Sequence, residues 1–277
     1  MQKISLGFST CPNDTFIFDA MIHQKVDTEG LDFDIILGDV EELNQKAIHA
    51  ELDVTKISYH AYSKIENNYL ILDSGSALGF KNGPLLISKL KVYPDEINDL
   101  TIAIPGQNTT ANLLFSIAYP DAKHKTEYLF SDIEEAVLSN EVDAGLIIHE
   151  NRFTYEMKGL KKIVDLGEYW EKETGLPIPL GGIVVNRKLN EDLQHTINRV
   201  LKRSVEFAFE NPKSAFPFIK KHAQEMDEQV MYKHIELYVN EFTRELGKDG
   251  RNAISELYKR AISLGIIPKM NKQIFLT

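Results

Sequence analysis

The chain has 277 residues, of which 43% are hydrophobic, 9% aromatic and 26% charged, and these proportions exclude collagen, coiled coil and wholesale disorder. Its length is enough for a large buried core, in one domain or in two. The 31 Lys and Arg side chains are outnumbered by 41 Asp and Glu, for a net charge of −10, which argues against a nucleic-acid partner because a protein that neutralises phosphates needs a basic stripe.

Short apolar runs alternate with helical patterns through the first third of the chain. Residues 3–8 alternate apolar and polar side chains, which predicts a strand, and Cys11-Pro12-Asn13-Asp14 predicts a turn. A helix over residues 15–24 follows, and Asn13 or Asp14 is expected to cap it. Further elements are predicted as strands at residues 31–37, 53–57, 69–72 and 85–88 and a helix at residues 40–50. This alternation is typical of an α/β sheet with helices on its faces.

The pattern restarts after Tyr93-Pro94-Asp95. A strand at residues 101–104 stops at Pro105-Gly106, and a helix follows at residues 108–119. The capping box Ser131-Asp132-Ile133-Glu134 opens a helix that runs through Leu138. The remaining predicted elements are strands at residues 143–148, 160–166 and 181–185, and helices at residues 169–174, at 189–208, after Asn211-Pro212 and around 254–261.

The restart near residue 101 and a return near residue 182 predict two α/β lobes, the second inserted into the first. Lobe 1 comprises residues 1–98 and 180–277, and lobe 2 comprises residues 99–179. Open α/β sheets bind ligands at the carboxyl ends of their strands, and pockets favour domain interfaces. The functional site is therefore expected in the cleft between the lobes.

Several signatures of large enzyme classes are absent from the sequence. The glycine-rich dinucleotide fingerprint and the P-loop do not occur, and the Gly-x-Ser-x-Gly and His-Glu-x-x-His patterns are missing as well. There is one cysteine, Cys11, and the eight histidines are scattered. No metal site is therefore expected.

The single cysteine also bears on the compartment. It cannot form an intrachain disulfide, which fits a reducing environment. The first apolar stretch ends at Ser9, too early for a secretory signal, and no window approaches the roughly 20 apolar residues that span a bilayer. We therefore expect a cytoplasmic protein without a membrane span.

Two turns of lobe 1 are candidates for ligand binding. Asn13 and Asp14 lie where the first strand gives way to a helix, so that backbone N–H groups can attract an anion there. The alternative is a turn that only caps the helix. Lys56, Ile57 and Ser58 end the third strand and are expected to face the same cleft, with a solvated Lys56 as the alternative.

Two places in lobe 2 complement them. Thr109, Thr110 and Ala111 lie at the equivalent strand-to-helix turn, where hydroxyl and amide groups suit a carboxylate, although Thr109 could simply cap the helix. His149 ends a predicted strand, beside Glu150. A histidine at the mouth of a cleft suits general acid–base catalysis, with a structural role as the alternative.

Several longer segments resemble one enzyme family. They are Cys-Pro-Asn-Asp-Thr-Phe at residues 11–16, Val-Thr-Lys-Ile-Ser-Tyr-His-Ala-Tyr at 54–62, Gly-Ser-Ala-Leu-Gly-Phe-Lys-Asn-Gly-Pro-Leu at 75–85, Asn-Thr-Thr-Ala at 108–111 and Ile-His-Glu-Asn-Arg-Phe-Thr-Tyr at 148–155. In this order they resemble the 1,4-dihydroxy-6-naphthoate synthases of the futalosine route to menaquinone. The resemblance implies a two-lobed, periplasmic-binding-protein-like type II fold with a ligand cleft between the lobes.

The resemblance also implies an activity and a site. Enzymes of this family are lyases that convert cyclic dehypoxanthine futalosine to 1,4-dihydroxy-6-naphthoate by carbon–carbon cleavage, and no metal or organic cofactor is implied. His149 matches the family's proton acceptor, and its substrate-binding stretches match Lys56, Ile57, Ser58, Thr109, Thr110 and Ala111. Thr10 and Asn151 depart from the family pattern without touching a proposed role.

The expected partner is thus a small-molecule carboxylate. Because the protein carries a net charge of −10, local groups must attract this anion against the global field. The helix start at Asn13 and Asp14, with Lys56 and Arg152, is expected to supply that attraction.

Three alternatives stay open at this point. Chorismate dehydratase of the same pathway shares the fold, although residues 13–16 and His149-Glu150 favour the synthase. A non-catalytic binding protein for a small carboxylate would need an export signal or a lipid-anchor cysteine, and Cys11 lies instead within the first strand–turn unit. The ligand-sensing part of a transcription regulator would need a helix-turn-helix module, for which no basic segment is spare.

Overall fold

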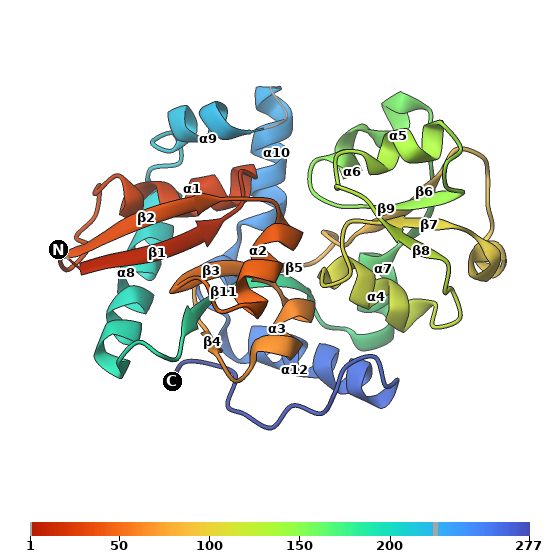
Figure 1. The fold of residues 1–277 in the computed structure, drawn as a ribbon. Coiled ribbons are helices and arrows are strands. Elements are labelled where there is room, and N and C mark those ends of the chain that lie inside the picture. Colours follow the sequence, from red (N-terminus) through yellow and green to blue (C-terminus); the bar gives the residue numbers. More distant parts are fainter. Residues whose placement is uncertain (1, 224–226) are drawn as a thin grey trace.

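The computed structural model describes residues 2–223 and 227–277, and these residues form two α/β lobes around two separate sheets (Figure 1). The first sheet has the strand order β2-β1-β3-β11-β4, with β5 paired to β11. The long strand β11 runs antiparallel to β3, β4 and β5, whereas β1 pairs in parallel with β2 and β3. The strands of this first sheet are β1 (Gln2–Phe8), β2 (Leu31–Leu37), β3 (Val54–Ser58), β4 (Tyr69–Ile71), β5 (Ala77–Gly79) and β11 (Ile178–Asn186).

The second sheet belongs to the middle of the chain and has the order β10-β6-β9-β7-β8. Strand β7 is parallel to β8 and β9, while β6 is antiparallel to β9 and β10. Its strands are β6 (Leu85–Ser88), β7 (Ile102–Ile104), β8 (Lys125–Glu127), β9 (Ala144–Ile147) and β10 (Lys161–Asp165).

Helices flank both sheets (Figure 1). Three helices follow strands of the first sheet: α1 (Pro12–Ile22), α2 (Val40–Ile48) and α3 (Tyr59–Ile65). The C-terminal part of the chain adds α8 (Glu191–Glu210), α9 (Phe216–His222), α10 (Glu228–Tyr238), α11 (Glu241–Arg244) and α12 (Gly247–Ser263). Those of the middle segment are α4 (Thr110–Ala118), α5 (Ile133–Leu138), α6 (Asn151–Thr154) and α7 (Leu166–Thr174), with 3-10 turns at Pro94–Asp99 and Tyr155–Lys158. The mixed architecture agrees with the predicted two-lobed α/β fold.

The start of α1 differs from the prediction. Cys11 is the N-cap residue and Pro12 is the first residue of the helix, so α1 begins three residues earlier than expected. Proline suits this position because its missing N–H has no partner in the first turn of a helix. Asn13 and Asp14 therefore lie inside the first turn and cap nothing, and their side chains are available for other contacts.

Two other predicted helix starts are wrong. Asn211 does not open a helix but ends α8 as its C-cap, and α9 begins only at Phe216. No capping box forms at Ser131, because the N-cap of α5 is Asp132, whose side chain makes no capping hydrogen bond. In both cases a local motif was compatible with more than one place relative to the helix end.

Strand β6 determines where the chain passes from one lobe to the other. The predicted boundary at residue 99 would leave β6 in lobe 1, but β6 pairs with β9 and β10 in the second sheet. We propose that the outward crossing lies in residues 80–84, between β5 and β6, and that the chain returns between α7 and β11.

The lobes are joined by packed apolar side chains. One buried cluster contains Ile57 of β3, Phe115 of α4, Trp170 of α7 and Leu257 of α12, and it therefore continues from the first lobe into the second. The Trp170 indole is fully buried and donates its Nε1–H to the carbonyl of Pro177 at 3.1 Å. This core fixes the ends of the strands around the space between the lobes.

Gly83 offers a test of the outward crossing. A Cβ at this position would overlap the backbone N and Cα of Gly167, at the start of α7. Gly83→Ala is therefore expected to lower the free energy of unfolding by about 1–3 kcal/mol, the usual cost of overpacking. Urea denaturation measures this loss. Gly38→Ala is the control, because its Cβ would meet only the flexible Glu42 side chain, and equal losses in the two variants would contradict the packing at the crossing.

Candidate active site

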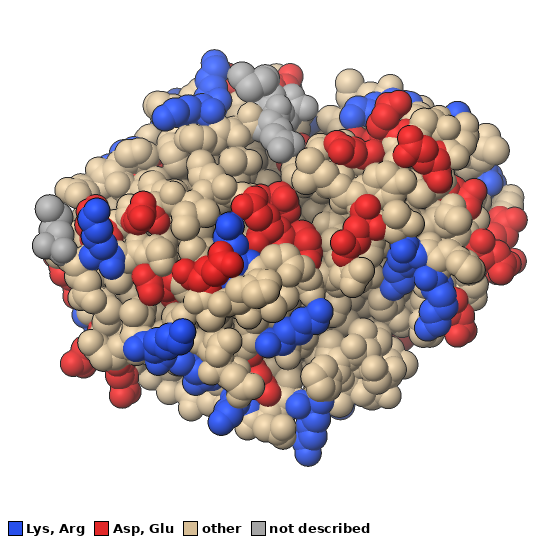
Figure 2. All heavy atoms as spheres, in the orientation of Figure 1, with Lys and Arg blue, Asp and Glu red and all other residues tan. Residues whose placement is uncertain are grey.

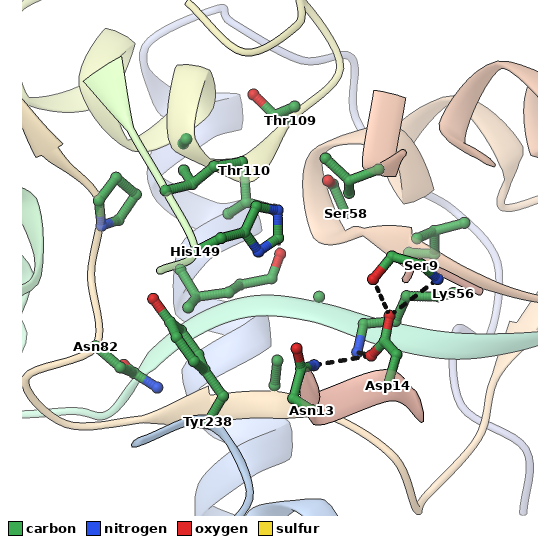
Figure 3. A pocket seen from close by; sticks show the side chains of 18 of the residues that line it. Ser9, Asn13, Asp14, Lys56, Ser58, Asn82, Thr109, Thr110, His149 and Tyr238 are labelled. Atoms are coloured by element: carbon green, nitrogen blue, oxygen red, sulfur yellow. Dashed lines mark hydrogen bonds and ion pairs between the residues drawn. The ribbon is translucent and has the colours of Figure 1, made fainter. Parts of the chain in front are cut away.

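A pocket lies between the lobes, and the space in and at its mouth that protein atoms do not fill amounts to about 690 Å³, open solvent included. Strand ends, helix starts and α10 contribute its walls (Figure 3). The lining residues are Ser9, Asn13, Asp14, Val40, Lys56, Ile57, Ser58, Ala77, Asn82, Pro84, Thr109, Thr110, Ala111, Ile148, His149, Leu180, Gly181, His234 and Tyr238.

Almost all of the site residues predicted from the sequence meet at this pocket. They are Asn13, Asp14, Lys56, Ile57, Ser58, Thr109, Thr110, Ala111 and His149. Arg152 is the exception. Its guanidinium lies 3.2 Å from the Asp165 carboxylate and donates to the carbonyl of Gly83, so it holds the outward crossing rather than lining the pocket.

Lys56 and Asp14 form a buried ion pair, with 2.8 Å between Nζ and Oδ1. The other carboxylate oxygen of Asp14 accepts from the backbone N–H and the hydroxyl of Ser9, at 3.2 and 2.7 Å (Figure 3). Lys56 is therefore not a solvated charge. It is also not a free cation, because its positive charge is balanced inside the protein, and an anionic ligand meets a neutral pair.

A chain of hydrogen bonds leads from this pair to α10. Asn13 donates its Nδ2–H to Asp14 Oδ1 at 2.8 Å. The Oδ1 atom of Asn13 lies 2.9 Å from His234 Nε2 and, as an amide oxygen, can only accept a hydrogen bond from it. His234 Nε2 consequently carries a hydrogen. Burial, with His149 and Lys56 nearby, lowers the pKa of His234 well below its usual value, so the ring is neutral at neutral pH.

His234 also approaches the second lobe. Its Nδ1 lies 3.6 Å from Oε2 of the buried Glu150. Because Nε2 is the protonated nitrogen, Nδ1 presents a lone pair toward the carboxyl group. Within residues 2–223 and 227–277, neither Nδ1 nor this oxygen has a hydrogen-bond partner. Glu150 thus approaches α10 and is not among the residues that line the pocket, although it follows His149 in sequence.

His149 lies two residues beyond the end of β9 and has a positive φ of 59°, in the left-handed region that few non-glycine residues adopt. This backbone turns its imidazole into the pocket, where Nδ1 is 3.5 Å from Cys11 Sγ of the other lobe. The ring also packs edge-on against Phe130 and parallel to His234, with centroids 5.0 and 6.1 Å apart. Residues from both lobes therefore orient the ring.

Burial determines the protonation of the two groups in this contact. It lowers the pKa of His149 below the usual value, although the nearby Glu150 and Asp14 oppose the shift. It raises the pKa of the Cys11 thiol well above the usual value. At neutral pH a neutral imidazole therefore lies beside a protonated thiol. When His149 Nδ1–H donates to the sulfur, Nε2 keeps a lone pair and can act as a base.

The start of α4 presents backbone rather than side-chain donors. The Thr109 hydroxyl caps the helix by accepting from Asn112 N–H at 3.3 Å, and it donates to the carbonyl of Gly106. The Thr110 hydroxyl donates to Leu180 O and accepts from His60 N–H. Both hydroxyls are thus occupied. The N–H groups of Thr110 and Ala111, in the first turn, have no carbonyl partner within the helix and can hold a carboxylate.

Ser58 contributes a further donor. Its Oγ accepts from Asn44 Nδ2 at 3.2 Å and its backbone N–H donates to Asn44 Oδ1 at 2.9 Å. The hydroxyl hydrogen remains for a ligand. Nearby His60 has its Nδ1 3.2 Å from Thr109 O, and burial lowers its pKa to about 4. His60 lies outside the lining of the pocket.

Sequence reasoning missed Ser9, Asn82, His234 and Tyr238. His234 and Tyr238 lie four residues apart and therefore share one face of α10, but no local pattern tells that this helix reaches the pocket. Burial raises the pKa of Tyr238 to about 12, so its phenol stays protonated. Asn82 lies within the segment 75–85 that carries the family resemblance, which was the available signal.

As far as the structure describes the chain, the face drawn in Figure 2 has no basic patch at the junction of the lobes that would attract anions toward the pocket. Acidic and basic side chains are interspersed on the face in Figure 2, and acidic ones gather over α2 near the junction of the lobes, where Glu41 and Glu42 occupy the first helical turn. Glu41 accepts from Asn108 N–H across the junction at 3.1 Å. An anionic ligand must therefore be held by donors inside the pocket rather than by the field outside.

Within residues 2–223 and 227–277, no group of three or more His, Cys, Asp or Glu side chains could hold a metal ion. No helix among these residues is both long enough and apolar enough to cross a lipid bilayer.

Comparisons with known proteins bear on the same pocket. The family model for menaquinone biosynthesis matches residues 4–263. A curated 1,4-dihydroxy-6-naphthoate synthase from Thermus thermophilus is 40% identical over 276 residues, 100% of both chains. Another, from Streptomyces coelicolor, is 39% identical over 274 residues, 97% of this chain and 96% of its own.

Solved structures agree with the fold. Protein AF1704 from Archaeoglobus fulgidus is 37% identical and superposes with a TM-score of 0.90, over 96% of this chain and 98% of its own. A Candida albicans gene product with the generic periplasmic binding protein fold has a TM-score of 0.72 at 11% identity, over 99% of this chain and 94% of its own. The second likeness bears on the fold alone, and it confirms the predicted two-lobed class.

Proposed function

Because the chain belongs to the menaquinone-biosynthesis family and matches 1,4-dihydroxy-6-naphthoate synthases over its whole length, we propose that its inter-lobe pocket converts cyclic dehypoxanthine futalosine to 1,4-dihydroxy-6-naphthoate. The chain is an enzyme, and carbon–carbon lyase chemistry fits the name of its relatives. These relatives favour the synthase over chorismate dehydratase, a non-catalytic binding protein and a regulator. In this proposal the protein acts in the cytoplasm, as expected from its sequence.

The base is the central element of the proposed mechanism. His149 is the imidazole that lines the pocket on a strained backbone, with a pKa lowered by burial. In its neutral form it removes a proton from a substrate hydroxyl through Nε2. The alkoxide then collapses to a carbonyl as the adjacent carbon–carbon bond breaks, in a retro-aldol manner. The sugar-derived fragment leaves, and the second ring becomes aromatic.

Binding of the substrate carboxylate is assigned to donors at the start of α4 and the end of β3. The N–H groups of Thr110 and Ala111 and the hydroxyl of Ser58 offer hydrogens there and no negative charge. Lys56 assists only as half of a neutral pair with Asp14. The pocket can therefore hold an aryl carboxylate although the whole protein carries a charge of −10.

Turnover of the futalosine-derived substrate tests this function. The purified protein is incubated with cyclic dehypoxanthine futalosine, and naphthoate absorbance is followed with time. We expect steady formation of 1,4-dihydroxy-6-naphthoate. Chorismate serves as the comparison substrate and is expected to remain unchanged. Dehydration of chorismate would identify a chorismate dehydratase instead. Binding of the futalosine derivative without formation of naphthoate would favour a non-catalytic binding protein or a regulator.

A further inference from the structure

Asn82 lines the pocket with a side chain that is 0% exposed. Among the residues that the structure describes, neither its Nδ2 nor its Oδ1 has a hydrogen-bond partner. Burial of an unpaired amide is costly, and such groups are rare in folded proteins. Its place in the pocket wall suggests that its partner enters with the ligand (Figure 3).

The segment that carries Asn82 is held from both sides. On one side Lys81 N–H donates to Glu171 Oε1 at 2.5 Å. On the other, the carbonyl of Gly83 accepts from Arg152, and the Gly83 backbone packs directly against Gly167. The amide therefore cannot easily leave the pocket to find water. Arg152, predicted to bind substrate, acts instead as a positioning residue for this segment.

The chemistry of an amide restricts what it can bind. Asn82 offers hydrogens on Nδ2 and lone pairs on Oδ1. A carboxylate accepts only, so it would satisfy Nδ2 and leave Oδ1 unpaired beside a negative charge. Hydroxyl groups both donate and accept, and two neighbouring hydroxyls satisfy both ends of the amide. An amide turned over by 180° has the same two needs, because both of its ends lack partners.

The donors at Ser58, Thr110 and Ala111 have the opposite character. They offer hydrogens to a ligand, which suits a carboxylate. The pocket thus has one end suited to an anion and another suited to hydroxyls. We propose that Asn82 binds the hydroxyls of the sugar-derived fragment, the part of the substrate that leaves when the naphthoate forms. This assignment rests on the proposed function and adds to it the residue that recognises the leaving fragment.

A comparison of the affinities for substrate and for product tells whether a residue contacts the carboxylate or the sugar-derived fragment. In a His149→Asn background, which suppresses turnover, titration calorimetry gives dissociation constants for both compounds. Asn82→Leu is expected to raise the constant for the substrate about tenfold or more, because buried hydroxyls lose their partners. It should change the constant for 1,4-dihydroxy-6-naphthoate, which lacks the sugar-derived fragment, by less than about twofold. Ser58→Ala is the matched control and should weaken both compounds to a similar degree.

Two results would overturn the assignment of Asn82. An unchanged affinity for the substrate would mean that the amide pairs only with water, and equal losses for substrate and product would place it at the carboxylate. Thermal unfolding of ligand-free Asn82→Leu should match that of the parent, since the exchange removes two unpaired polar atoms; if Leu disturbs the fold, Asn82→Ala repeats the comparison. Naphthoate formation by the wild-type protein is measured separately, so a failure of the proposed function is distinguishable.

Discussion

Replacing His149 by Asn is expected to lower turnover by about 10²- to 10⁴-fold, the usual contribution of a positioned acid or base. The asparagine amide can take the place of Nδ1 beside Cys11, but it does not reach the position of Nε2 and cannot take up a proton. The dissociation constant for 1,4-dihydroxy-6-naphthoate should change little, because the imidazole acts mainly in the transition state. Steady-state rates from naphthoate absorbance, together with product titration, measure both quantities.

The pH dependence of the wild-type rate identifies the same group. A base works in its neutral form, so the rate should fall as the pH drops through the pKa of His149. Burial lowers this pKa, which places the acidic limb below the ordinary histidine value of about 6.5. The limb should be absent from the residual activity of His149→Asn.

A half-exposed histidine supplies the control. His195→Asn changes a side chain on α8 whose nearest charged neighbour is Glu191 on the same helix, and it should leave rate and pH profile unaltered. A His149→Asn variant that retains more than about a tenth of the wild-type rate would show that another group takes the proton. His60 is a poor substitute because it lies outside the pocket lining and its pKa is lowered to about 4. His234 lines the pocket, but its Nε2 is engaged with Asn13.

Local periodicity accounts for what the sequence predicted well about the fold. The alternating pattern at β1 and the apolar stripe along α8 are properties of neighbouring residues, and both elements form at nearly the expected bounds. Helix ends were less certain, because Pro12 and Asn211 suit more than one position at a helix terminus. The place of β6 depends on its pairing with β9 and β10, which no local pattern contains.

The site shows the same division. Strand ends and helix starts predicted Lys56, Thr110 and His149, since an α/β sheet brings such positions to one edge. The partners of these residues were not predictable. Asp14 neutralises Lys56 from 42 positions away in sequence, and His234 reaches Asn13 across 221 positions. These contacts depend on how α1, β3 and α10 pack in three dimensions.

Lys56→Met is expected to lower the free energy of unfolding by about 3–5 kcal/mol, the usual loss when one partner of a buried ion pair is removed. Lys56 and Asp14 are 6% and 1% exposed, so water cannot replace the lost cation beside the carboxylate. Methionine fills most of the space of the lysine stem, which keeps cavity formation small. The loss is a large part of the 5–15 kcal/mol that typically holds a domain folded, and urea denaturation monitored by circular dichroism measures it.

Two further variants separate two contributions to this loss of stability: the unpaired charge left on Asp14 and the removal of the lysine side chain itself. Lys56→Met with Asp14→Asn removes both charges, and the double variant should regain a large part of the stability, because a neutral amide can keep hydrogen bonds to Ser9 without a cation. Lys202→Met breaks an exposed pair with Glu245, 3.1 Å apart, and should cost less than about 1 kcal/mol. If Lys56→Met were no worse than Lys202→Met, the carboxylate of Asp14 would have to be stabilised by Ser9 and Asn13 alone, and the wall of the pocket would tolerate an unpaired negative charge.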